Sequence, residues 1–195
     1  FIQGMNDVTR DLAPLVVSQL ELENVSVLLD VGGGPGTYAS AFQRAWPNIS
    51  EVRIFDLPDA LTIGRRQLEE WGLADKISFH PGNFHDDPLP AGADALWLSQ
   101  VLHSQDEVGC RELIAKSFYV LNPGGKLMVH EFLLNDDMAS PVMASLFAVH
   151  MLVMTEGGRT YSGLEIRGWM QAVGFADIEV KKVSDDTSVV IGKKL

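Results

Sequence analysis

The chain has very little cysteine, since Cys110 is the one cysteine among its 195 residues. A lone thiol cannot form an intramolecular disulfide, so the composition favours a reducing, cytoplasmic setting in which Cys110 is a buried and inert residue. Repeats and low-complexity segments are missing too. With 46% hydrophobic and 21% charged residues, the chain has enough apolar material for the core of one globular domain.

Basic side chains are also scarce. The sequence has 15 Lys and Arg against 26 Asp and Glu, a formal net charge of -11. Nucleic acids and anionic membrane surfaces are bound by basic surfaces. We therefore expect neither as a partner.

Long hydrophobic runs are nearly absent, and the first residues lack the basic and apolar regions of a signal peptide. The exception is the segment 138–155, which contains no Asp, Glu, Lys or Arg. It includes Pro141 and His150, and acidic residues flank it in place of the Lys and Arg that flank membrane spans. We predict that it is a buried helix of a soluble protein, with most of its methionines in the core.

Strand-like apolar runs alternate with helical patterns along the chain. This alternation predicts an α/β fold with a doubly wound, Rossmann-like, mainly parallel seven-stranded sheet. The last two runs are close enough to form a C-terminal antiparallel hairpin. Strands are expected at 26–31, 51–56, 76–80, 93–99, 126–132, 178–183 and 188–192, and helices at 37–46, 60–72, 107–121, 141–154 and 163–173.

A glycine-rich loop, Gly32 to Gly36, lies between the first strand and the following helix, where nucleotides bind in such folds. Asp56 ends the second strand, 24 residues after Gly32, where a carboxylate can accept hydrogen bonds from ribose hydroxyls. The loop departs from G-x-G-x-x-G and lacks a Walker lysine, which excludes ATP or GTP hydrolysis. Asp30 adds a second acid, and an acidic lining favours the cationic S-adenosylmethionine (SAM) over NAD. A ligand-free tight turn and an NAD(P) oxidoreductase remain alternatives.

The motifs together resemble the class I SAM-dependent methyltransferases, and among them the small-molecule O-methyltransferases of plant caffeate and isoflavone type and of bacterial tailoring pathways. The resemblance covers the whole chain. It implies transfer of a methyl group from SAM, with S-adenosylhomocysteine (SAH) as product, to a hydroxyl of a hydrophobic, aromatic small molecule. The matching segments are 29–36 (LDVGGGPG), 55–58 (FDLP), 101–103 (VLH), 121–126 (LNPGGK) and 157–160 (GGRT).

The resemblance also assigns roles to individual residues of the cofactor site. The glycine loop lies against the amino-acid end of the cofactor, Asp56 holds the ribose, and the Gly82-Asn83-Phe84 segment packs on adenine. Ser99 stands where the family often has a lysine that contacts the cofactor. The expected cofactor-binding residues are Asp30, Gly32, Gly33, Gly34, Asp56, Leu57, Asn83, Phe84 and Ser99.

His103 matches the family's general base, and Glu131 matches a carboxylate that orients it. A phenol or enol is a weak nucleophile until its proton leaves, so a histidine suits the reaction. The resemblance places Phe1, Met5 and Met151 in the acceptor pocket. No metal is expected, because the histidines and acids of the segment 80–87 fit no ligand spacing that we identify.

The sequence departs from the family pattern at several positions. Ser104-Gln105 follows the histidine in place of Asp-Trp, and Gly158 stands where plant enzymes have a second glutamate. These changes leave open C- or N-methylation on the same fold, or a cofactor-binding module without turnover. The family's N-terminal dimerisation domain is also missing. We therefore expect residues 1–195 to be a catalytic domain with a helical lead-in over 1–24, taken from a longer, homodimeric subunit.

Overall fold

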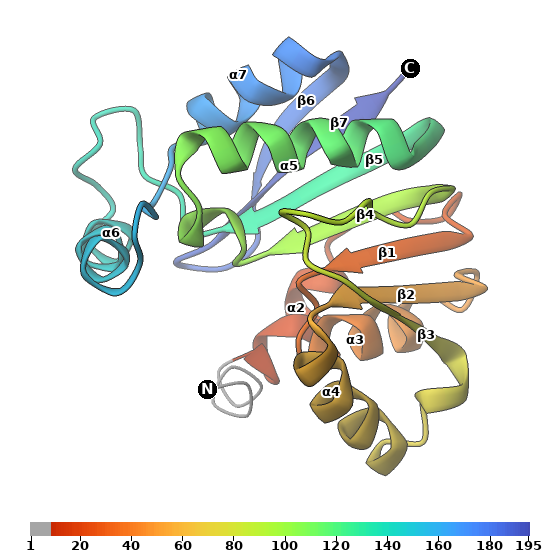
Figure 1. The fold of residues 1–195 in the computed structure, drawn as a ribbon. Helices are drawn as coiled ribbons and strands as arrows, with labels where there is room; N and C mark the ends of the chain where they lie inside the picture. The colour runs from red at the N-terminus through yellow and green to blue at the C-terminus, as the bar shows by residue number, and fades with distance from the viewer. Residues whose placement is uncertain (1–8) are drawn as a thin grey trace.

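A seven-stranded sheet forms the centre of the computed structural model, which describes residues 9–195 (Figure 1). Phe1 and Met5 lie outside the described residues. The strand order is β3-β2-β1-β4-β5-β7-β6. The first five strands of this order are parallel, and β7 runs antiparallel to both β5 and β6. The predicted sheet and hairpin are confirmed. The strands are β1 (Val27–Val31), β2 (Glu51–Asp56), β3 (Ile77–Pro81), β4 (Ala93–Ser99), β5 (Leu121–Glu131), β6 (Phe175–Lys182) and β7 (Ser188–Lys194).

Helices cover both faces of the sheet, as the βαβ alternation predicts. The helices are α2 (Leu12–Val17), α3 (Thr37–Ala45), α4 (Pro58–Glu70), α5 (Glu107–Val120), α6 (Val142–Met154) and α7 (Gly163–Val173), with short 3₁₀ turns η1 (Ala74–Lys76) and η2 (Leu102–Ser104). The first three helices pack on one face, and α5 and α7 pack on the other. Each layer thus buries one face of the same sheet.

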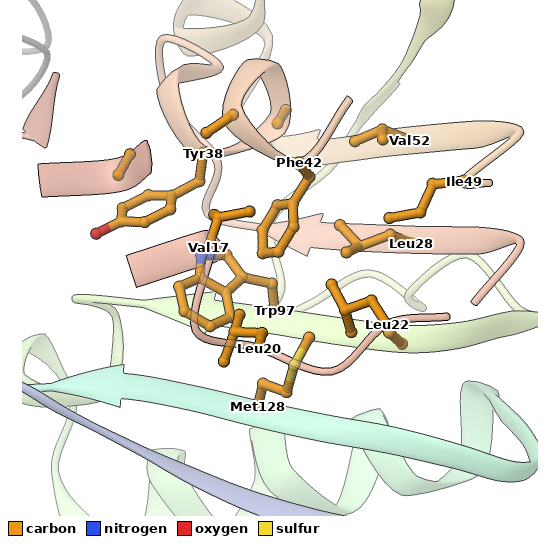
Figure 2. Packing of buried hydrophobic residues seen from close by; sticks show 14 of the residues in the cluster. Val17, Leu20, Leu22, Leu28, Tyr38, Phe42, Ile49, Val52, Trp97 and Met128 are labelled. Atoms are coloured by element: carbon orange, nitrogen blue, oxygen red, sulfur yellow. The ribbon is translucent and has the colours of Figure 1, made fainter. Parts of the chain in front are cut away.

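Successive residues of the central strands enter opposite cores, because side chains alternate across a strand. On β4, Trp97 packs in the core beneath α2–α4, whereas Leu96 and Leu98 pack in the core beneath α5 and α7. Figure 2 shows Trp97 beside Phe42 of α3, with ring centroids 5.3 Å apart. Burial on both faces explains why these strands are almost continuously apolar in sequence. Cys110 of α5 is buried, as predicted, and burial raises the pKa of its thiol to about 12.

Two strands begin earlier than the sequence predicts. β5 starts at Leu121, so the Pro-Gly-Gly segment expected to separate helix from strand lies inside the strand. The Asn122 amide donates to the Asp94 carboxylate at 2.8 Å and ties this start to β4. β6 starts at Phe175, directly after Gly174, whose φ of 116° ends α7.

The prediction that residues 138–155 form a buried helix is wrong about burial. The helix forms as α6, but only its inner side is covered, with Ala144 and Met151 buried. The reason is its place: α6 packs against η2 at the carboxyl edge of the sheet and not on either face. Three of its four expected core methionines are exposed. The exposed apolar residues of this segment are Met138, Val142, Met143, Leu146, Val149, Leu152, Val153 and Met154. Among residues 9–195, no helix is both long and apolar enough to cross a bilayer.

Candidate cofactor and catalytic site

The glycine loop turns sharply between β1 and α3. Gly32, Gly34 and Gly36 have φ of 73°, 50° and 80°, a region that other residues seldom adopt. The Gly32 amide donates to the Phe55 carbonyl of β2 at 2.8 Å. A Cβ atom on Gly32 would lie 2.8 Å from Cγ2 of Val101. The loop therefore lies directly against the segment that leads to His103.

Asp56 joins the second strand to this loop. Its carboxylate accepts hydrogen bonds from the Gly34 amide at 2.8 Å and from the Leu57 amide at 2.7 Å. Each carboxylate oxygen has two lone pairs, so both oxygens retain one acceptor site. The Leu57 side chain is exposed beside them. This arrangement leaves Asp56 able to accept from a pair of vicinal hydroxyls.

Asp30 lies under the loop and is buried, with 2% of its surface exposed. Its Oδ2 atom has no hydrogen-bond partner in the described part of the chain. A Cβ atom on Gly33 would lie 2.8 Å from this oxygen, so only a glycine backbone fits above it. Burial, and then the charge of Asp56, raise the pKa of Asp30 to about 8. An unpartnered buried carboxyl group is suited to a cationic ligand.

The segment after β3 is a compact, internally bonded loop. The Asn83 side chain donates to Asp86 at 2.8 Å and accepts from the His85 amide at 3.1 Å. The Lys116 ammonium of α5 donates to the carbonyls of Phe84 at 2.7 Å and His85 at 2.8 Å. Each polar atom of the Asn83 side chain thus has one partner within the loop, and Lys116 fixes the loop to the body of the domain.

His103 lies in η2, after β4, and its Nδ1 is 2.8 Å from Oε2 of Glu131 at the end of β5. The other oxygen of Glu131 accepts from the Leu102 amide at 2.9 Å. Glu131 is buried, and the His103 side chain is 12% exposed. The carboxylate is therefore fixed by the backbone, and it holds the ring with Nδ1 as the proton-bearing nitrogen. Nε2 remains as a proton acceptor.

Aromatic and apolar side chains surround this histidine. The Phe147 ring of α6 meets the His103 ring edge-on, with centroids 4.8 Å apart, and also packs on Phe132. Met151 lies one helical turn further along α6 and is buried. Gly158 is packed so tightly that a Cβ atom there would clash with the His103 carbonyl and the Thr155 hydroxyl. Position 158 therefore cannot accommodate the second glutamate of the family in this conformation.

A second histidine, His130, is buried in β5 and was not anticipated from the sequence. Its Nδ1 lies 2.9 Å from the Ser99 hydroxyl and 3.3 Å from the Tyr38 hydroxyl. Its Nε2 lies 2.8 Å from the Thr187 hydroxyl. The ring is stacked on Trp97, with centroids 5.4 Å apart. Burial lowers the pKa of His130 to about 3, so the ring is neutral. The available sequence signal was a histidine directly after the apolar run 127–129.

A hollow of about 690 Å³ lies elsewhere, between the β6–β7 turn and the start of α7. Leu134, Arg167, Lys182 and Asp185 are among the residues that line it. None of the predicted site residues lines it, so we do not assign it as the site. In the described part of the chain, no cluster of His, Cys, Asp and Glu could hold a metal ion.

Comparison with known proteins places the chain in a family. A family model described as an O-methyltransferase domain matches residues 1–176. The chain is 32% identical to acetylserotonin O-methyltransferase of Gallus gallus, covering 100% of this chain and 55% of that protein. It is 31% identical to 3-hydroxy-5-methyl-1-naphthoate 3-O-methyltransferase of Streptomyces sahachiroi, covering 100% and 56%. The chain thus spans about half the length of these curated relatives.

Solved structures agree. Human N-acetylserotonin methyltransferase in complex with SAM superimposes with a TM-score of 0.90 at 27% identity, covering 100% of this chain and 55% of that one. An O-methyltransferase family 2 protein from Planctomyces limnophilus in complex with apigenin gives 0.93 at 31% identity, covering 100% and 60%. From the family match and these likenesses we conclude that the chain belongs to the O-methyltransferase domain family.

Proposed function

We propose that this chain is the catalytic part of a SAM-dependent O-methyltransferase that methylates a hydroxyl group of a hydrophobic, aromatic small molecule. The observation that carries the proposal is the pair formed by His103 and Glu131, at the same edge of the sheet as the glycine loop. A histidine with one nitrogen fixed by a carboxylate and the other open can accept a proton from an acceptor hydroxyl.

The residues of the glycine site fit SAM. Asp56 is placed to hold the ribose hydroxyls, and Leu57 is exposed beside it. The unpartnered oxygen of Asp30 would suit the ammonium of the cofactor's amino-acid end, which the backbone of Gly32, Gly33 and Gly34 would hold. Phe84 offers a ring for adenine, and Asn83 shapes that loop. When bound, the cofactor supplies an electrophilic methyl group on a sulfonium.

The protein's own part in the reaction is positioning and proton removal. Phe147 and Met151 of α6 form an apolar wall beside His103, which suits a flat apolar acceptor. Nε2 of His103 takes the acceptor proton, and Glu131 stabilises the resulting imidazolium. An enzyme holds the two reacting atoms about 3 Å apart, and this orientation supplies much of the acceleration. From the family resemblance alone, we also propose that Phe1 and Met5 contribute to the acceptor pocket.

We also propose that the complete subunit is homodimeric, that it acts in a reducing, cytoplasmic setting, and that it binds no nucleic acid. The acidic net charge of -11 and the single cysteine support the last two points. The apolar outer side of α6 supports the first, since large exposed apolar patches mark interaction surfaces.

Mass spectrometry tests the activity. The chain is incubated with SAM and with a panel of phenols, enols, amines and carbon nucleophiles, and methylated products are sought. We expect products on hydroxyl acceptors. Products confined to amines or carbon would favour a different methyltransferase, and cofactor binding without any product would favour a binding module.

Calorimetry with SAH tests the cofactor assignment separately. Asp56→Ala should weaken binding at least about tenfold, the equivalent of about 1.4 kcal/mol. Asp75→Ala, which removes an exposed acid of η1, is the matched control and should leave the affinity unchanged. Unchanged affinity in Asp56→Ala would contradict the assignment.

A further inference from the structure

The buried contacts of His130 extend from the surface to the edge of the cofactor site. Ser99 lies opposite His130 in the strand register, and Trp97 lies opposite Asp30. Residues paired across neighbouring strands share a face of the sheet, and so do residues two apart on one strand. Asp30, Trp97, Ser99 and His130 therefore share one face. Tyr38, from the helix that follows the glycine loop, packs on Trp97 with ring centroids 5.2 Å apart (Figure 2).

The hydrogen bonds of the β6–β7 turn determine which nitrogen of His130 carries the proton. The Ser184 hydroxyl oxygen accepts from the amides of Asp186 at 3.3 Å and Thr187 at 2.9 Å. Both lone pairs are then used, so its own hydrogen goes to the Thr187 hydroxyl, 2.7 Å away. Thr187 in turn donates its hydrogen to Nε2 of His130. Because the ring is neutral, its proton is on Nδ1.

This proton assignment leaves a hydrogen-bond donor at the site. Nδ1–H of His130 donates to the Ser99 hydroxyl at 2.9 Å. The Tyr38 hydroxyl lies 3.3 Å from the same nitrogen. At most one of the two hydroxyl hydrogens can lie between Ser99 and Tyr38, so at least one has no acceptor among the described residues. Ser99 is only half-buried, so a ligand can reach it.

We propose that His130 is a positioning residue, held as the Nδ1–H tautomer, that makes the Ser99–Tyr38 pair a donor for the carboxylate of the cofactor's amino-acid end. The inference rests on the proposed function. An α-amino acid group is a zwitterion, and this face of the sheet offers a partner for each charge. The unpartnered oxygen of Asp30 would accept from the ammonium, and the spare hydroxyl hydrogen would donate to the carboxylate.

Two measurements test the proposal. Long-range ¹H–¹⁵N correlation spectra of the wild-type chain should show His130 protonated on Nδ1. Calorimetry should show that Ser99→Ala weakens SAH binding about tenfold. The same variant should bind 5′-methylthioadenosine, which lacks the amino-acid end, within about twofold of wild type. Ser117→Ala removes another buried hydroxyl, one bonded within α5, and should change neither affinity.

Substitutions of the ring separate positioning from mere packing. His130→Asn places an amide near Nδ1 and should retain more SAH affinity than His130→Gln, whose amide lies near Nε2. An Nε2–H tautomer, an equal loss for both ligands in Ser99→Ala, or unchanged SAH binding would overturn the proposal. A wild-type chain that fails to bind SAH would overturn both this proposal and the proposed function.

Discussion

His103 and His130 are two histidines at the same edge of the sheet, and both are connected to the end of β5. His103 bonds to Glu131, whereas His130 is the residue directly before it. Because the strand is pleated, the two residues of β5 point to opposite faces. One histidine has a carboxylate and an open nitrogen, and the other has hydroxyls on both nitrogens.

The difference shows that partners, not residue type, decide what a histidine can do. The charge of a fixed carboxylate lies beside Nδ1 of His103 while Nε2 stays open, which is the arrangement proposed for the general base. The hydroxyls around His130 offer no such charge, and burial keeps its pKa at about 3. The first arrangement suits proton transfer, and the second suits a fixed direction of hydrogen bonding.

The largest expected effect follows from removing His103, the less buried of the two histidines. His103→Ala should lower turnover about 10²- to 10⁴-fold, the usual contribution of a general base. SAH affinity measured by calorimetry should not change, because the ring is assigned to the acceptor and not to the cofactor. His80→Ala, in the edge strand β3, is the matched control. Retained turnover in His103→Ala would remove it as the base.

The next effect concerns the carboxylate. Glu131→Gln keeps the size and the acceptor for the Leu102 amide but removes the charge opposite His103. Turnover should fall about 10- to 100-fold, the rate equivalent of one charge-assisted hydrogen bond. Glu107→Gln removes an exposed ion pair with Arg111 and should change turnover by less than about twofold. Equal effects of the two variants would contradict the assigned role of Glu131.

The pH dependence of stability tests the buried carboxyl group of Asp30. Its pKa is about 8 in the native state against an ordinary value of 3.8. Between these values the native state binds more protons than the unfolded state, so this group lowers stability as pH rises from about 4 to 8. Asp30→Asn should therefore melt at least about 2–4 °C above wild type at pH 8, with a smaller gain at pH 5. Asp75→Asn is the control, and an equal gain at both pH values would argue against the buried acid.

The last test concerns the buried histidine, His130. Its native pKa of about 3 lies below the ordinary 6.5, so the unfolded state binds more protons between these values. Stability from this group is fully present above pH 6.5 and is lost as pH falls towards 3, by at most about 1.4 kcal/mol per pH unit. Thermal melting of His130→Asn between pH 6.5 and 4 should depend less on pH than wild type does. An identical slope would indicate that His130 titrates normally.

Much of the fold could be predicted because local patterns determine it. Buried parallel strands are apolar throughout, and glycines and prolines mark their ends. The same strand ends supply Asp30, Asp56 and Ser99, so their place at one edge follows from the topology. The hydrophobicity of α6 predicted that a helix forms but not how little of it is buried, because burial depends on which elements pack against it.

The contacts of His130 and Lys116 could not be predicted in this way. Tyr38 and Thr187, which bond to His130, come from positions 92 and 57 residues distant in the sequence. The carbonyls bonded by Lys116 lie about thirty residues before it, and carbonyls carry no sequence signal. The internal bonds of Asn83 were likewise hidden, since its family match suggested only contact with adenine.

Gly158 limits how this site can change by mutation. Any side chain at position 158 would collide with the His103 carbonyl and the Thr155 hydroxyl. The single substitution Gly158→Glu is therefore not tolerated. The segment 155–160 would first have to move, and only then would a second carboxylate be tolerated. The two steps are epistatic, so their order is fixed, and a laboratory evolution experiment that selects at position 158 alone should return glycine.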